Sequence, residues 1–235
     1  MDIEARERAC LELLQKLPID EYVLIGGYAA SSFDFPRFSV DLDIVIDKKK
    51  EKPFVKIILE SGFAPIETNV EPVRDIYGGR FLRFEKEDVK ANVDLLINSV
   101  ISRQTGSSYS FGYLLKHSEI REVVGFSGSL KVRARAANRE MLIALKANSM
   151  RLADKRDIIA LCNGEINIDI LMKHLKRCPR KIILKHIEDL LKTLSEDRYK
   201  DPIKGVFRLS DSVYEKITER ATKVFGYIRD SLKDS

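Results

Sequence analysis

The chain has 235 residues, of which 44% are hydrophobic and 33% are charged, and its formal net charge is +5. A chain of this length can bury one sizeable core or two modest ones, and we expect two packed units. It contains no apolar run of the roughly 18 residues that a membrane span needs, and its first residues are amphipathic and acidic rather than signal-like. We therefore expect a soluble, cytoplasmic protein with no membrane partner.

The three cysteines, Cys10, Cys162 and Cys178, are widely spaced and odd in number. This spacing offers neither a disulfide framework nor a C-x-x-C zinc site, so ordinary thiols in a reducing compartment are expected.

Positive charge is concentrated in the second half of the chain. Residues 1–133 hold 19 Lys and Arg against 21 Asp and Glu, whereas residues 134–235 hold 22 against 15. The stretch 170–187 contains several basic residues and no acidic one. It is either a footprint for a phosphate backbone or a solvated helix face, and the sequence leaves both readings open.

The first elements predict a strand followed by a glycine turn and a helix. Apolar residues at helical spacing predict a helix over 3–16, which Pro18 ends, and the run 22–25 predicts a buried strand. Gly26 and Gly27 follow this strand directly, and a short helix is expected over 28–33.

The later pattern predicts an α+β fold, with a small mixed β-sheet and flanking helices followed by a C-terminal helical bundle. The remaining elements of the first unit are strands over 40–46, 80–84, 91–97, 119–125 and 129–133, a hairpin connection over 85–90, and a helix over 52–61. Helical periodicity then covers 138–150, 154–163, 168–177, 180–194 and 211–232. We place the boundary near residue 134, with a catalytic domain over 1–133 and a helical domain over 134–235.

Three aspartates within the predicted strands indicate a metal site. Asp41 and Asp43 are two residues apart, so they project from the same face of one strand, and Asp94 joins them if its strand is a neighbour. Three adjacent carboxylates repel one another unless a cation intervenes, and oxygen ligands suit Mg²⁺ or Mn²⁺. Two such ions would serve an in-line displacement at phosphorus, with Asp94 as the general base on an acceptor hydroxyl.

Two glycines and a serine near these aspartates indicate a phosphate cradle. Gly26 and Gly27 lack a Cβ, so backbone N–H groups can approach a phosphate closely at a helix N-terminus, and Ser39 is placed to contact a phosphate. A tight turn without a ligand explains the two glycines equally well.

The order of these motifs resembles the signature of the DNA-polymerase-β-like nucleotidyltransferases. The likeness rests on Leu24-Ile25-Gly26-Gly27, then Asp41-Leu42-Asp43-Ile44, then Val93-Asp94-Leu95-Leu96. Within that superfamily the chain is most similar to the AbiEii-type toxins and related minimal prokaryotic nucleotidyltransferases. Arg37-Phe38-Ser39-Val40-Asp41-Leu42-Asp43 resembles their Arg-x-Thr/Ser-x-Asp-x-Asp, and the likeness covers about residues 22–160.

The resemblance also implies roles for residues in the helical half. Lys146, followed by Arg151, Asp154 and Asp157, is similar to the family's Lys…Arg…Asp-x-x-Asp element, in which the lysine reaches the nucleotide phosphates. Position 160 carries no acid, so either Asp154 or Asp157 fills the orienting role. Arg37 either contacts the substrate or pairs with Asp34.

The function that the resemblance implies is transfer of an NMP unit from a nucleoside triphosphate to an acceptor hydroxyl. The basic helical half favours RNA as the acceptor, with the 3′ end of tRNA first, and an antitoxin-like protein is a possible partner. A protein or small-molecule acceptor, and a nucleotide-binding module without turnover, are the alternatives.

Overall fold

The computed structural model describes residues 3–67, 75–126, 128 and 130–234, and the chain divides into two compact units. The first unit comprises Met1–Ile101 and Ser108–Asn138, and the second comprises Ser102–Ser107 and Arg139–Ser235. We describe each unit by itself. Among the described residues, no helix is both long and apolar enough to cross a bilayer.

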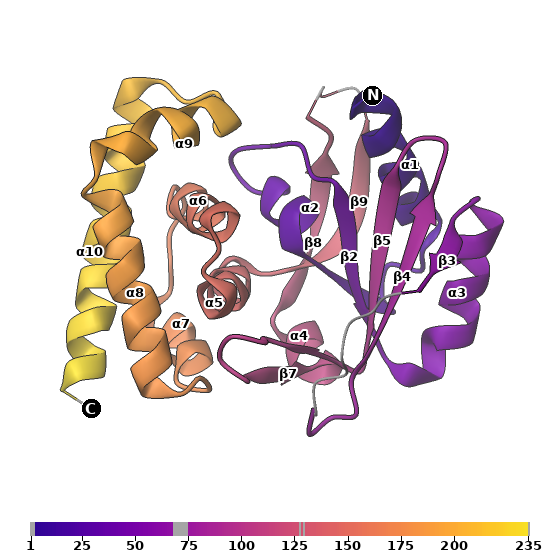
Figure 1. The fold of residues 1–235 in the computed structure, drawn as a ribbon, viewed down its shortest axis with the longest axis horizontal. Coiled ribbons are helices and arrows are strands. Elements are labelled where there is room, and N and C mark those ends of the chain that lie inside the picture. Colours follow the sequence, from indigo (N-terminus) through magenta and orange to yellow (C-terminus); the bar gives the residue numbers. More distant parts are fainter. Residues whose placement is uncertain (1–2, 68–74, 127, 129, 235) are drawn as a thin grey trace. The chain divides into compact units, whose positions relative to one another are not determined.

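A mixed sheet of seven strands forms the centre of the first unit (Figure 1). Its strand order is β3-β4-β5-β2-β1-β9-β8, in which the β2–β5 and β1–β9 pairs are parallel and the others antiparallel. The strands are β1 (Tyr22–Ile25), β2 (Asp41–Ile46), β3 (Ala64–Ile66), β4 (Arg80–Lys86), β5 (Ala91–Ile97), β8 (Ser118–Val124) and β9 (Lys131–Ala137). A separate two-stranded sheet pairs β6 (Ser99–Ile101) with β7 (Ser108–Ser110).

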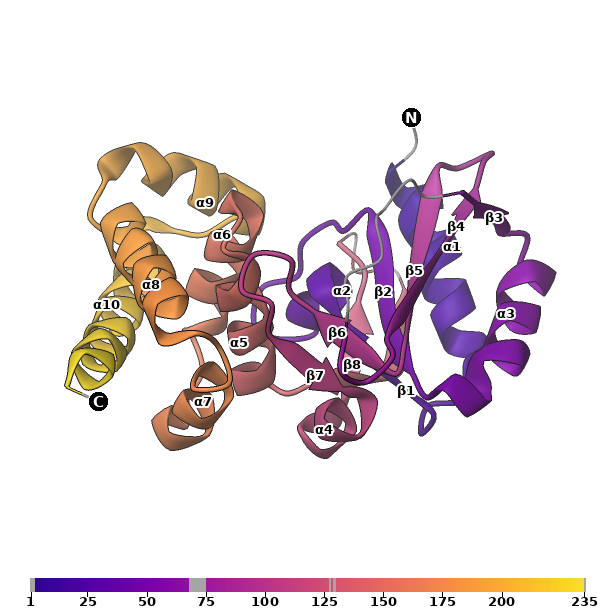
Figure 2. The same ribbon diagram turned by 60° about the horizontal axis from the view of Figure 1, so that its bottom comes forward.

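One face of the sheet is apolar and the other is partly polar. Along β5, residues 91, 93, 95 and 97 are buried, whereas the alternating residues are only partly so, which is the period expected of a strand. Helices α1 (Ile3–Lys16) and α3 (Glu51–Glu60) lie on one side of the sheet, and α2 (Gly26–Ser31) lies on the other (Figure 2). Helix α4 (Phe111–Lys116) follows β7 and contacts β1.

Helix α1 is held by an apolar stripe and by charges that suit its ends. Its buried side chains include Cys10, Leu13 and Leu14, and the helix contacts β5 and β9. Glu4 lies in the first turn and Lys16 in the last, where each complements the helix dipole. The sequence predicted these bounds for α1.

The second unit is helical, and two ion pairs connect its helices. It contains α5 (Arg139–Ser149), α6 (Leu152–Leu161), α7 (Ile168–Leu175), α8 (Arg180–Leu194), α9 (Lys200–Phe207) and α10 (Asp211–Lys233). Lys146 of α5 pairs with Asp157 of α6, and Lys155 of α6 pairs with Asp189 of α8 at 2.6 Å. The segment Ser102–Ser107 is tied to α5, because the Thr105 hydroxyl donates to Asn148 Oδ1 at 2.6 Å.

The α+β fold class predicted from the sequence is confirmed, with differences in detail. Helix α2 begins at Gly26 itself and ends at Ser31, so the prediction over 28–33 was displaced by two residues. The strand predicted over 129–133 is β9, which runs from Lys131 to Ala137; residue 129 lies outside the described residues. The boundary was predicted near residue 134, and in the structure the first unit ends at Asn138.

Several short elements were not predicted. Strands β3, β6 and β7 have three residues each, which is too few for a periodic pattern to be recognised. Helix α9 contains Pro202 and Gly205, both of which lower helix propensity, although a proline is tolerated in the first turn.

All three cysteines are free and buried, and burial raises the pKa of the Cys10 and Cys162 thiols to about 12.

Candidate active site

The register of the sheet brings the three predicted aspartates together on one face. Asp43 of β2 lies opposite Asp94 of β5 in the parallel pair, and Asp41 precedes Asp43 by two residues on the same face. Asn92, which is opposite Asp41, donates from Nδ2 to Asp41 Oδ1 at 3.0 Å. We call Asp41, Asp43 and Asp94 the aspartate cluster.

Arg83, on the neighbouring strand β4, pairs with one member of the aspartate cluster. Arg83 of β4 lies opposite Asp94 in the antiparallel β4–β5 pair. It donates from Nε to Asp94 Oδ1 at 2.7 Å and from Nη2 to Asp94 Oδ2 at 3.0 Å, and Nη2 lies 3.6 Å from Asp41 Oδ2. Such a two-bond pairing is the strongest geometry available to an arginine and a carboxylate.

The pairing and the burial of these side chains shift the pKa values of Arg83 and Asp94. The hydrogen bonds to Asp94 raise the pKa of Arg83, and the charges of Asp94, Asp41 and Asp43 act in the same direction. Burial raises the pKa of Asp94, whose side chain is 14% exposed, while the hydrogen bonds and charge of Arg83 act to lower it. With Arg83 beside it, we expect Asp94 to be ionised, because a guanidinium at hydrogen-bonding distance favours the charged carboxylate.

The two glycines allow the end of β1 to approach the cluster. Gly26 has a φ of +68°, and a Cβ placed there would lie 2.7 Å from Cγ of Asp43. A Cβ on Gly27 would lie 2.9 Å from Cβ of Ser39 and 3.1 Å from Nη2 of Arg37. Both positions therefore require glycine for reasons of space.

The loop between α2 and β2 holds Arg37 and Ser39 against this turn. Ser31 Oγ donates to the carbonyl oxygen of Arg37 at 3.0 Å, and Arg37 Nη1 donates to the carbonyl oxygen of Phe38 at 2.9 Å. Ser39 is buried, and its hydroxyl donates to the carbonyl oxygen of Asp41 at 3.4 Å. Seven of the predicted site residues thus lie around the junction of β1, α2 and β2 with β5.

The other three predicted site residues lie in the second unit, where they form a buried network. Lys146 is 6% exposed, and its Nζ donates to Asp157 Oδ2 at 2.5 Å and lies 3.7 Å from Asp154 Oδ1. Asp154 accepts from the backbone N–H of Arg151 at 3.1 Å and from Arg151 Nε at 2.8 Å, so it caps the start of α6. Lys146 thus pairs with both aspartates that the sequence left open, and Asp157 is the nearer of the two.

The aspartate cluster offers a divalent cation the oxygen ligands it prefers. Asp41 and Asp43 share a face, and Asp41 is 37% exposed, so both suit one oxygen-liganded ion. Both oxygens of Asp94 are occupied by Arg83. Consistent with this, no group of three or more His, Cys, Asp or Glu side chains in the described part of the chain is arranged to hold a metal. The residues therefore fit an ion at Asp41 and Asp43, and the hydrogen bonds and positive charge of Arg83 oppose a cation at Asp94.

Comparison with solved structures gives 12 matching chains, of which two are described below. No protein-family model matches the sequence, and no curated protein matches it. The fold is similar to the crystal structure of JHP933 from Helicobacter pylori, with a TM-score of 0.49 and 19% identity, over 98% of this chain and 92% of that one. It is also similar to the STING-associated CdnE c-di-GMP synthase from Capnocytophaga granulosa, with a TM-score of 0.25 and 14% identity, over 98% and 80% of the two chains. Neither likeness assigns the chain to a family.

Two residues of the site were missed by the sequence reasoning, namely Arg83 and Asn92. Asn92 precedes Asp94 by two residues, so strand alternation alone places it on the same face and was a usable signal. Arg83 is found only from the register of β4 against β5.

We expect Gly26→Ala to destabilise the first unit and displace Asp43. The left-handed backbone alone costs a non-glycine residue about 1–2 kcal/mol, and the added methyl meets the Asp43 carboxylate. Urea denaturation measures the loss. The control is Gly112→Ala in α4, where an added Cβ meets nothing within 4 Å, and it should be neutral or slightly stabilising. Equal stability of the two variants would contradict the close approach of Gly26 to Asp43.

Proposed function

We propose that the chain is a metal-dependent nucleotidyltransferase that transfers an NMP unit from a nucleoside triphosphate to an acceptor hydroxyl. The observation that carries the proposal is the in-register placement of Asp43 and Asp94 on parallel strands, with Asp41 beside them and the Gly26 backbone against Asp43. Carboxylates grouped on one sheet face next to a glycine turn suit phosphoryl-transfer chemistry.

Each residue of the site has a defined task in this proposal. Asp41 and Asp43 would hold one Mg²⁺ or Mn²⁺ ion, and Asp94, once released by Arg83, would help to hold the second ion of the predicted pair. The two ions would stabilise the charge on the attacking and leaving oxygens. The backbone at Gly26 and Gly27, with Arg37 and Ser39, would bind the triphosphate. Asp94 would accept the proton of the acceptor hydroxyl, a task it can perform only when Arg83 does not occupy both of its oxygens.

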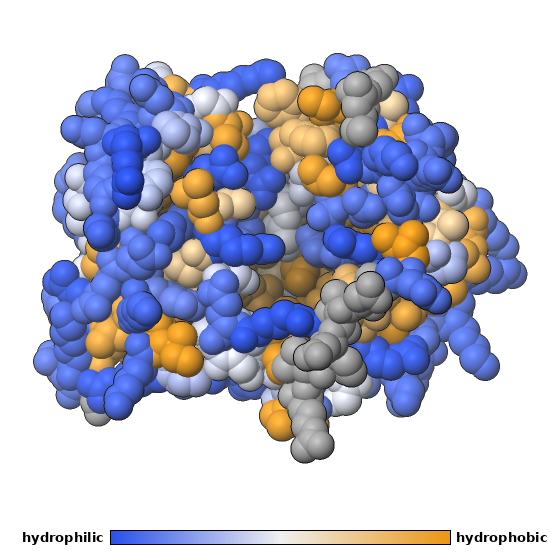
Figure 3. All heavy atoms as spheres, in the orientation of Figure 1, coloured by the Kyte–Doolittle hydropathy of each residue, from blue (hydrophilic) through white to orange (hydrophobic). Residues whose placement is uncertain are grey.

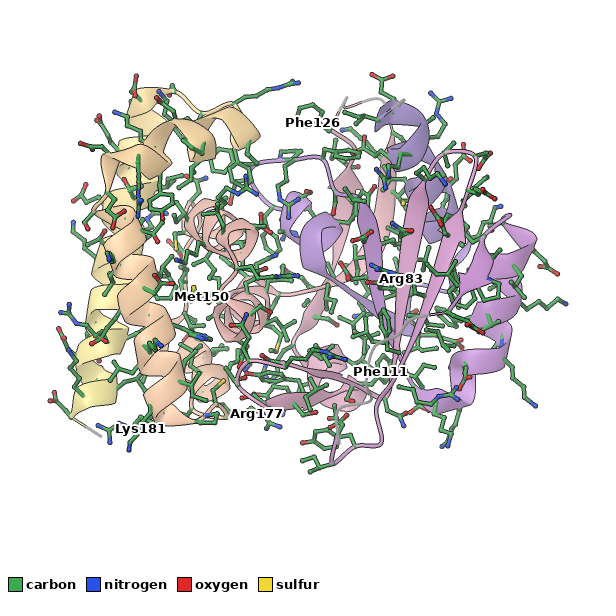
Figure 4. The ribbon with its side chains drawn as sticks, in the orientation of Figure 1. Arg83, Phe111, Phe126, Met150, Arg177 and Lys181 are labelled. Atoms are coloured by element: carbon green, nitrogen blue, oxygen red, sulfur yellow. The ribbon has the colours of Figure 1, made fainter. Side chains whose placement is uncertain are left out.

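The exposed basic residues of the stretch 170–187 support RNA as the acceptor. They are Lys173, Lys176, Arg177, Arg180, Lys181 and Lys185, which we call the basic surface. Hydrophilic residues predominate over α8 and α10 in Figure 3, and Figure 4 labels Arg177 and Lys181 of this surface. Arg180 also donates from Nε to the carbonyl oxygen of Leu232 at 2.6 Å, which ties the start of α8 to the end of α10. A cluster of cations without acidic residues is the usual footprint of a phosphate backbone.

The experiment that tests the reaction is a labelling assay. The protein is incubated with Mg²⁺, each α-labelled nucleoside triphosphate in turn and total RNA, and the RNA, protein and small-molecule fractions are then separated. We expect label in RNA, with the 3′ end of tRNA as the first candidate, and none when EDTA is added. Label in protein or in a small molecule would keep the reaction and change the acceptor.

We expect the triple variant Lys173→Gln/Lys176→Gln/Lys181→Gln to weaken RNA binding by about tenfold or more at low salt. Because each phosphate contact to a single strand contributes a slope of about −0.7, the plot of log K against log salt should become shallower by about 2. Filter binding over a salt series measures both. The matched control is Lys192→Gln/Lys216→Gln/Lys223→Gln, which removes the same charge from other exposed positions of this unit. Equal losses in both triples would contradict a specific basic surface.

A second candidate is a nucleotide-binding module without turnover. The observation that favours it is the double hydrogen bond of Arg83 to Asp94, which withholds the third carboxylate. A toxin-like role and an antitoxin-like partner stay predictions of the sequence resemblance, and the cytoplasmic location stays a prediction of the composition.

A further inference from the structure

Arg83 occupies the position in the aspartate cluster where a cation is needed. Arg83 donates two hydrogen bonds to Asp94, and its Nη2 lies 3.6 Å from Asp41 Oδ2. One guanidinium therefore contacts two of the three carboxylates. Figure 4 shows Arg83 over the strands of the sheet rather than at its edge. Without a cation here, two carboxylates in register on adjacent strands would repel each other.

The exposure of the pair distinguishes it from a purely structural ion pair. The side chains of Arg83 and Asp94 are 32% and 14% exposed, whereas those of Lys146 and Asp157 are 7% and 1% exposed. An ion pair whose cationic partner is partly open to water contributes less to stability than a fully buried pair, because water can solvate that partner when the contact opens. Arg83 can therefore leave Asp94 for water at a smaller cost than Lys146 can leave Asp157.

We propose that Arg83 is an internal counter-cation that competes with a divalent cation for Asp94. When Arg83 holds Asp94, only Asp41 and Asp43 are available to an ion; when it releases Asp94, the third carboxylate joins the site. Arg83 is thus a positioning residue that sets the affinity of the cluster for metal. The inference rests on the proposed function only for the identity of the cation. It predicts how tightly the aspartate cluster binds that cation in the absence of nucleotide.

The test is the affinity of the full chain for Mn²⁺ without nucleotide, measured by calorimetry and by the EPR signal of free Mn²⁺. Replacing Arg83 with Gln removes one positive charge within about 4 Å of the ligands, and we expect Mn²⁺ to bind about tenfold more tightly. Arg83→Lys keeps the charge but loses the two-bond grip, so its affinity should lie between those of the wild type and Arg83→Gln.

The matched control is Arg80→Gln, which removes the same charge from the same strand. Arg80 pairs with Glu51 and lies opposite Ile97, three residues from Arg83 and therefore on the other face. Its Mn²⁺ affinity should equal that of the wild type. Circular dichroism checks that each variant is folded; if Arg83→Gln is not, the comparison of Arg83→Lys with Arg80→Gln decides.

The outcomes separate this inference from the proposed function. Unchanged or weaker Mn²⁺ binding by Arg83→Gln would overturn the inference, even if the wild type transfers nucleotides. Tighter binding by Arg83→Gln would support the inference, even if no variant transfers nucleotides. Equal tightening in Arg80→Gln would show a general charge effect and would also overturn it.

Discussion

The double variant Asp41→Asn/Asp43→Asn should lose nucleotidyl transfer by roughly 10³-fold or more while remaining folded. Asparagine keeps the shape of each side chain but removes the two charges that the proposed metal requires. Because Asp43 lies directly opposite Asp94, the substitution also relieves repulsion within the cluster, so stability should not fall. Single-turnover labelling of RNA measures the rate, and urea denaturation measures the stability.

The control for this variant is Asp20→Asn/Asp88→Asn, which makes the same charge change at two exposed positions of the first unit. It should retain the wild-type rate. If the Asp41→Asn/Asp43→Asn variant also retained the wild-type rate, the aspartate cluster would not be the active site. If the variant were instead largely unfolded under the conditions of the rate assay, the loss of rate would follow from a structural role of the two aspartates.

Lys146→Met should lower the free energy of unfolding by about 3–5 kcal/mol, because removing one partner of a buried ion pair leaves the other charge desolvated. Lys146 Nζ lies 2.5 Å from Asp157 Oδ2 and 3.7 Å from Asp154 Oδ1, and all three side chains are buried. Urea denaturation followed by circular dichroism measures the loss. Lys216→Met, at an exposed position of α10, should change stability by less than about 0.5 kcal/mol.

A second variant separates the structural role of Lys146 from the phosphate contact that the resemblance predicts. Lys146→Met/Asp157→Leu replaces the buried pair with two apolar side chains, so neither charge is left desolvated, and it should recover part of the lost stability. If this double variant is as stable as the wild type and still transfers nucleotides, Lys146 is structural. If it is stable but inactive, Lys146 is required for the reaction, as the sequence resemblance implies.

The fold class and the strands that carry the aspartates were predictable because their patterns are local. The apolar run of β1 ends at the two glycines, and the alternation in β2 and β5 assigns Asp41, Asp43 and Asp94 to definite faces. Strand pairing was not predictable in the same way. The parallel pairing of β2 with β5 joins residues about fifty positions apart, and nothing in either strand specifies its neighbour.

Arg83 was missed because its position depends on the length of a turn. The charged run 85–90 was predicted as the whole hairpin connection, which would pair residue 84 with residue 91. The strands instead continue to Lys86 and Ala91, and the turn closes over four residues with Lys90 at a φ of +56°. This shifts the register by two residues and places Arg83, rather than Phe81, opposite Asp94.

The burial of Lys146 was not predicted from the sequence. The family resemblance implies a lysine that reaches the nucleotide phosphates, and the structure shows its side chain buried against Asp157. Helix α5 is buried on nearly all sides, and Met141, Ala144 and Ala147 are fully enclosed. A helix of this kind offers a lysine no solvent face, so the partner acid has to come from another helix.

Pyrophosphate release tests most directly whether the aspartate cluster performs a reaction rather than only binding a nucleotide. The wild-type protein is mixed with RNA and each nucleoside triphosphate in turn, and pyrophosphate is followed by a coupled assay with and without Mg²⁺. We expect release with at least one nucleotide, dependent on Mg²⁺ and abolished in Asp41→Asn/Asp43→Asn. Nucleotide binding without pyrophosphate release under any of these conditions would contradict catalysis by the aspartate cluster and would favour a nucleotide-binding module without turnover.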